Sequence, residues 1–176
     1  LDVVVEVLKG RTFDGKDALV QCLVAVAGAS REYIAATPDK MKRVIAALMR
    51  EAAKDTNKEY KLAVLAHVST FLKGCNEDCD ELAAVVSIVA PTIKPKEDDD
   101  DGADSDEEER RKLSARSELL VIAGYDALAK AVTASPTTGV LASSADVWAL
   151  VARTAAACTW KTAVPVFATA EAMLKR

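Results

Sequence analysis

Apolar residues recur every three or four positions along most of the chain, which is the spacing of helices that bury one face. The periodic segments are separated by glycines, prolines and capping residues, such as Gly10, Thr37-Pro38 and Ser135-Pro136. The pattern predicts eight helices, beginning near residues 1, 14, 38, 57, 77, 110, 144 and 159. Asn57 and Ser144 are expected to cap the helices that begin with them, and Pro91 and Pro95 to end the fifth helix. The first segment is also compatible with a strand, because it contains four valines in seven residues.

Eight helices with short turns make four helical hairpins, and the second helices of the hairpins resemble one another. A lysine recurs near the start of three of them, in the strings Gly15-Lys16-Asp17-Ala18-Leu19, Tyr60-Lys61-Leu62-Ala63-Val64 and Trp160-Lys161-Thr162-Ala163-Val164. With Glu118 at the equivalent point of the third hairpin, successive steps are 45, 57 and 43 residues. HEAT-type repeats have a period of about 40–47 residues. We therefore expect an all-α solenoid of about four HEAT-type hairpins.

The long step contains an acidic insert. Ten of the thirteen residues from Glu97 to Glu109 are acidic. Such a run buries no apolar surface and repels itself, so it predicts a disordered loop inside the third hairpin. The expected organisation is hairpins 1 and 2 with the first helix of hairpin 3 over 1–95, the loop over 96–109, and the remainder over 110–176. Ser105 precedes four acidic residues and is a candidate phosphorylation site.

Composition narrows the class of protein. A hydrophobic content of 51% supports a substantial core, whereas a net charge of −4 does not favour a nucleic-acid-binding protein. The chain has no signal-peptide pattern and no apolar run long enough to cross a membrane. Four cysteines are too few for a disulfide scaffold, which favours an intracellular protein. Without the insert, the chain has 17 acidic and 23 basic residues, so its helical body is basic. One hypothesis is that the acidic loop folds back over this basic body and inhibits binding of an acidic partner.

One string has the glycine and lysine spacing of a phosphate-binding loop, Gly10-Arg11-Thr12-Phe13-Asp14-Gly15-Lys16-Asp17. Asp17 stands where a magnesium-binding hydroxyl is needed, and no parallel sheet is predicted to carry the loop. A helix–helix turn capped by Asp14 is the preferred interpretation, and a nucleotide-binding enzyme is a remote alternative.

Neither a metal site nor a hydrolytic centre is predicted. Cys75 and Cys79 form a single C-x-x-x-C pair, whereas a structural zinc site needs four ligands. His67, the only histidine, lies in an apolar helix without a nucleophile pattern around it. We expect no cofactor and no catalytic residue.

The recurring lysines and the two tryptophans have both structural and functional interpretations. Lys16, Lys61 and Lys161 fit an ion-pair ladder with neighbouring carboxylates, or alternatively a basic stripe that binds an acidic partner. Trp148 and Trp160 are predicted mainly to pack between repeats, with partner anchoring as the alternative.

The strings Gly10 to Leu19, Tyr60 to Val64 and Thr159-Trp160-Lys161 resemble, in order and spacing, the HEAT repeats near the C-terminal end of a family of proteasome adaptor and scaffold proteins. The resemblance implies a non-catalytic scaffold that binds the core and regulatory particles of the 26S proteasome, in the cytoplasm and nucleus. It implies no contact residues. Another HEAT scaffold, such as a nuclear-transport receptor or trafficking adaptor, is the alternative. Because the chain starts at Leu1 and ends directly after a helical pattern, we expect it to be part of a longer array.

Overall fold

The computed structural model describes residues 1–11, 13–54, 57–75, 79–92 and 107–176. These residues form nine helices and no strand. The helices are α1 (Asp2–Leu8), α2 (Lys16–Ala29), α3 (Arg31–Ala35), α4 (Pro38–Ala52), α5 (Lys58–Lys73), α6 (Leu82–Thr92), α7 (Glu107–Ala134), α8 (Thr137–Ala155) and α9 (Trp160–Leu174).

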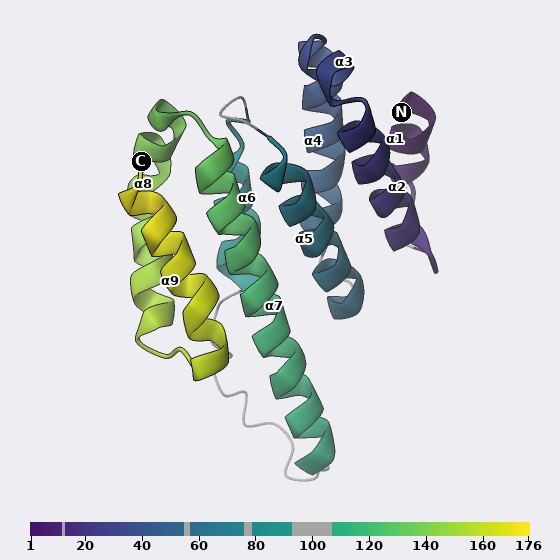
Figure 1. The fold of residues 1–176 in the computed structure, drawn as a ribbon. Coiled ribbons are helices and arrows are strands. Elements are labelled where there is room, and N and C mark those ends of the chain that lie inside the picture. Colours follow the sequence, from purple (N-terminus) through teal and green to yellow (C-terminus); the bar gives the residue numbers. More distant parts are fainter. Residues whose placement is uncertain (12, 55–56, 76–78, 93–106) are drawn as a thin grey trace.

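The helices are arranged in two parallel layers. In one layer α1 contacts α4, α4 contacts α6, and α6 contacts α8; in the other, α2, α5, α7 and α9 contact one another in that order. Each layer takes one helix from each hairpin, and Figure 1 shows α1 and α2 at one end of the array and α8 and α9 at the other. The predicted all-α solenoid of four hairpins is confirmed. The first segment is a helix, and the short α3 is an addition that the pattern did not predict.

One apolar core runs through the described helices, from Val5 in α1 to Met173 in α9. It consists largely of alanine, valine and leucine, which allow neighbouring helices to approach closely. Gly124 illustrates this approach, because a Cβ built there would lie 3.2 Å from Val89 Cγ1 of α6. The largest fully buried side chain is Tyr125 in α7.

Capping residues fix several helix boundaries. Asn57 accepts hydrogen bonds from the backbone N–H groups of Glu59 and Tyr60, as its predicted capping role requires. Thr159 forms a capping box with Thr162 at the start of α9.

Two predicted boundaries are wrong. Ser144 does not cap the penultimate helix, because α8 already begins at Thr137, directly after Pro136, whose fixed φ suits the entry to a helix. The Ser144 hydroxyl instead donates to the Leu141 carbonyl within α8. Pro91 does not end the fifth predicted helix but lies in the last turn of α6.

Most of the acidic insert lies outside the described residues, since positions 93–106 are not among them. The predicted loop, the candidate phosphorylation site at Ser105 and the inhibitory role of the loop therefore stay predictions. Helix α7 begins at Glu107, earlier than the expected start near residue 110. Acidic residues stabilise the first turn of a helix, where the helix dipole is positive. In the part of the chain that the structure describes, no helix is both long and apolar enough to cross a membrane.

Candidate interaction surface

Lys16 anchors the loop that resembles a phosphate-binding loop. Its side chain has no exposed surface, and its Nζ donates to the Gly10 carbonyl at 2.7 Å and lies 3.3 Å from Glu51 Oε2. Gly15, with a φ of 82°, precedes α2 in the left-handed conformation, so Gly15 is the N-cap residue and not the predicted Asp14. The amine that a nucleotide phosphate would need is thus occupied by groups of the protein itself.

Glu51 joins three elements at this point. Its Oε2 accepts a hydrogen bond from the Tyr60 hydroxyl at 2.8 Å and lies 2.7 Å from Lys54 Nζ, in addition to its contact with Lys16. Burial raises the pKa of Glu51, but the hydrogen bonds from Lys54, Tyr60 and Lys16 outweigh burial and lower it overall. The carboxylate is therefore held in its charged form, and it connects the start of α2 and the end of α4 to the start of α5.

The three recurring lysines do not form one exposed stripe. Lys16 and Lys61 are buried, with exposed fractions of 0% and 4%, because both lie on the inner faces of their helices. Lys161 is exposed and pairs with Glu118 of α7 at 3.3 Å, as the ion-pair interpretation expects for this lysine. A partner docking on the surface would reach Lys161 but neither of the other two.

Side-chain hydrogen bonds join α7 to α5, α8 and α9. The Tyr125 hydroxyl donates to the Leu150 carbonyl at 2.8 Å and lies 2.7 Å from Thr154 Oγ1, which ties α7 to α8. Thr169 of α9 donates to the Tyr125 carbonyl at 3.1 Å. Ser69 of α5 donates to Asp126 of α7. Hydrogen bonds thus hold both α8 and α9 on α7.

The thiols and the histidine lie in surroundings that lower the reactivity of Cys79 and disfavour the charged form of His67. Cys79 is buried, and its hydrogen bond with Cys75, together with burial, raises the pKa of its thiol, which lowers its reactivity. Burial lowers the pKa of His67, with Asp17 opposing this effect only weakly. Among the described residues, no three His, Cys, Asp or Glu side chains come close enough together to hold a metal ion.

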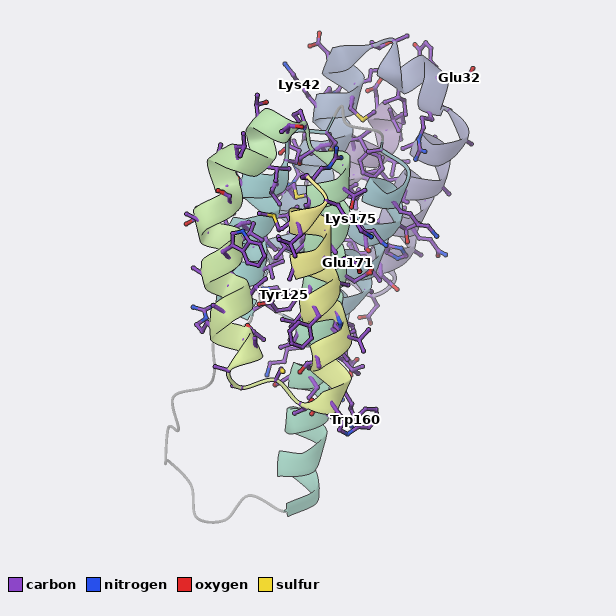
Figure 2. All side chains as sticks on the ribbon, turned by 60° about the vertical axis from the view of Figure 1, so that its left-hand side comes forward. Glu32, Lys42, Tyr125, Trp160, Glu171 and Lys175 are labelled. Carbon is purple, nitrogen blue, oxygen red and sulfur yellow. The ribbon has the colours of Figure 1, made fainter. Side chains whose placement is uncertain are left out.

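The candidate functional feature is an exposed apolar surface on α9. Four large apolar side chains of α9 are exposed, three of them at successive helical turns, and we call them the terminal apolar surface: Trp160 (82% exposed), Val164 (73%), Phe167 (58%) and Leu174 (78%). The exposed Glu171, paired with Lys175, lies between Phe167 and Leu174 on the same face. Figure 2 shows Trp160 projecting from the first turn of α9, whereas Tyr125 lies in the interior. On α8, the other helix of the hairpin, Leu141 and Trp148 are also exposed.

This surface corrects the expectation for the tryptophans. Trp160 does not pack between the described repeats, and Trp148 is only partly covered. Large aromatic side chains in an exposed apolar group are typical of docking surfaces. The sequence pattern placed them on helices but could not distinguish the inner face of α9 from its outer face.

Comparison with known proteins identifies a family but no individual relative. A family model described as ECM29, C-terminal ARM-like repeats, matches residues 27–176. The match includes the strings around Lys61 and Lys161 but not the one around Lys16. No curated protein and no solved structure matches the chain.

Proposed function

The chain belongs to the family of ECM29 C-terminal ARM-like repeats, and on this premise we propose that it is a non-catalytic protein-interaction scaffold that binds the proteasome. The terminal apolar surface carries the scaffold part of this proposal. The proteasome as partner is supported by the family and by the resemblance of the repeated strings. The same resemblance supports a location in the cytoplasm and nucleus.

The terminal apolar surface is suited to docking because its exposed side chains are large and lie on a fixed helix. Burying Trp160 and Phe167 under a partner would remove two aromatic side chains from water, each of which buries about 150–250 Å² in a typical contact. The hydrogen bond from Thr169 to the Tyr125 carbonyl holds α9 on α7 before binding, and the one from the Tyr125 hydroxyl to the Leu150 carbonyl holds α8 there. Little conformational entropy is then lost when a partner docks.

A capture experiment tests the partner and the surface separately. The 176-residue chain is immobilised and exposed to purified 26S proteasome, core particle and regulatory particle. We expect capture of at least one of these particles by the natural chain, and loss of most of it in the double variant Trp160→Asp/Phe167→Asp.

Leu119→Asp is the matched control, because Leu119 is an exposed apolar residue (48%) on α7, outside the terminal apolar surface. Its capture should equal that of the natural chain. If the natural chain captures no particle, the proteasome proposal is wrong. Equal capture by the double variant would instead show that another surface makes the contact.

A further inference from the structure

Two cysteines lie side by side where the second hairpin joins the third. Cys79 is buried, and the half-buried Cys75 packs against the same apolar core. Their thiols are hydrogen-bonded to each other, and Cys75 Sγ also donates to the Phe71 carbonyl at 3.6 Å. Two sulfur atoms at hydrogen-bonding distance need to approach only slightly to reach the bond length of a disulfide, about 2.05 Å.

Backbone hydrogen bonds hold each cysteine in place. The Cys75 N–H donates to the Leu72 carbonyl in the last turn of α5, at 2.9 Å. The Cys79 N–H donates to the Ala134 carbonyl at 3.2 Å, and the Cys79 carbonyl accepts from the Ser135 hydroxyl at 3.0 Å. The first cysteine is therefore fixed at the end of α5, and the second at the end of α7.

The residues next to the two cysteines are also held in place. The guanidinium of Arg31 lies against Gly74, the residue before the first cysteine, and occupies the space that a Cβ there would need. The carboxylate of Asp80, the residue after the second cysteine, lies in the same way against Gly139 in the first turn of α8. Groups from α3, α7 and α8 thus position the pair, so the two sulfur atoms lie close together before any reaction.

We propose that Cys75 and Cys79 form a reversible disulfide by exchange with a small-molecule disulfide, such as glutathione disulfide. The Cys75 sulfur attacks one sulfur of glutathione disulfide, the S–S bond of the oxidant breaks, and one glutathione leaves. The Cys79 sulfur then attacks the Cys75 sulfur and displaces the second glutathione. Two protein thiols are oxidised to one disulfide, and one glutathione disulfide is reduced to two glutathione molecules, which take up the two thiol protons.

The order of attack follows from exposure and hydrogen bonding. Cys75 is partly exposed, whereas only 2% of Cys79 is, so the oxidant meets Cys75 first. The hydrogen bond with Cys75 is the largest cause of the raised pKa of the Cys79 thiol, ahead of burial. A Cys75 sulfur that carries glutathione no longer accepts this bond as a thiolate. Cys79 then loses that cause of its raised pKa and becomes the attacking thiol of the second step.

The disulfide would fasten the end of α5 to a residue that is fixed on α7, and so stiffen the junction between two hairpins. Transient disulfides of this kind act as redox sensors in reducing compartments. Coupling between disulfide formation and folding is reciprocal, so the factor by which folding favours the disulfide is also the factor by which the disulfide favours the folded chain. The inference goes beyond the proposed function and does not depend on the identity of the partner.

Equilibration in glutathione buffers tests the pair directly. The natural chain is equilibrated at a series of glutathione to glutathione disulfide ratios, both folded and in urea that unfolds it. Free thiols are then trapped with N-ethylmaleimide. Trypsin cleaves after Lys73 and not again before Lys94, so both cysteines fall in one peptide. In the folded chain this peptide should appear without label and lighter by two hydrogen atoms, with an equilibrium constant at least about tenfold higher than in the unfolded chain.

Two results would overturn the proposal. One is an equilibrium constant in the folded chain that is equal to or below that in the unfolded chain. The other is a Cys75 that keeps its thiol or stops at the glutathione adduct while Cys79 is still labelled after unfolding. The exposed Cys22 is the internal control, because it should form only the adduct.

Thermal unfolding of the oxidised and reduced chains gives a second measurement. Oxidation should raise the melting temperature of the natural chain. Cys79→Ala should show no such increase, because its Cys75 can only form the adduct. If Cys79→Ala does not fold, Cys75→Ala at the half-buried position provides the same comparison. An unchanged or lower melting temperature in the oxidised natural chain would contradict the reciprocal coupling. Capture of proteasome particles is measured on the reduced chain, so neither result affects the test of the other proposal.

Discussion

Lys16 Nζ lies 3.3 Å from Glu51 Oε2, and neither side chain has exposed surface. The two residues come from neighbouring hairpins, so their contact fixes the start of α2 against the end of α4. Among the described residues, the second Glu51 oxygen, Oε1, is buried without a hydrogen-bond partner, and the charged Arg50 Nε lies 3.6 Å from it. The stability of this end of the array therefore depends on the charge of one carboxylate.

Glu51→Gln should destabilise the fold strongly. The substitution keeps the size of the side chain but removes the charge that compensates Lys16, and breaking a buried ion pair typically costs about 3–5 kcal/mol. We expect the free energy of unfolding, measured by urea titration, to fall by about 3 kcal/mol. Glu6→Gln, in the exposed pair with Lys9, is the control and should leave the urea midpoint unchanged.

A double-mutant cycle with Lys16→Met shows whether the pair is the cause. Once the lysine is absent, the loss of the Glu51 charge should matter less, so the double variant should lose less stability than the sum of the two single variants. Strict additivity would show that Glu51 stabilises the fold through Lys54 and Tyr60 alone.

The same carboxylate should make stability depend on pH in the acid range. The pKa of Glu51 is lower in the folded chain than its ordinary value of 4.5. Its contribution is fully present above the unfolded-state pKa and is lost as the pH falls through the lower, folded-state pKa. The stability difference between the natural chain and Glu51→Gln should therefore shrink as the pH is lowered below 4.5. A difference that stays constant down to about pH 2 would contradict the lowered pKa of this carboxyl.

Tyr125→Phe should weaken the contact between α7 and α8. The change removes a buried hydroxyl that donates to the Leu150 carbonyl, which is then left without that donor. We expect a loss of about 1–2 kcal/mol in the free energy of unfolding. Thr133→Val is the comparison: the Thr133 hydroxyl donates to the Ala129 carbonyl of its own helix, so its removal should cost less. Equal losses would mean that the link between the helices contributes little.

Local signals in the sequence predicted local features well. Asn57 and Thr159 cap their helices because a capping side chain contacts backbone only two or three residues away. The Lys16–Glu51 pair joins positions 35 residues apart, and no local rule connects them. One signal was available, since Glu51 follows the buried Ala47 and Leu48 at helical spacing and so shares their face.

The exposure of Trp160 and Phe167 is a different case. A helix that is apolar around most of its circumference gives the same pattern whether one face or both are covered. Only the exposed fractions of Trp160 and Phe167 in the described structure distinguish the two cases.

Two glycines in helices should respond oppositely to alanine. A Cβ on Gly28 of α2 meets no atom within 4 Å, so Gly28→Ala should gain the helix propensity of alanine, about 0.8–1 kcal/mol. A Cβ on Gly139 of α8 would lie 2.1 Å from Asp80 Oδ1. The carboxylate would have to leave the first turn of α8, where its charge is favourable to the helix dipole. Thermal unfolding should show a higher melting temperature for Gly28→Ala and a lower one for Gly139→Ala. An increase at both positions would mean that Asp80 moves aside at no cost.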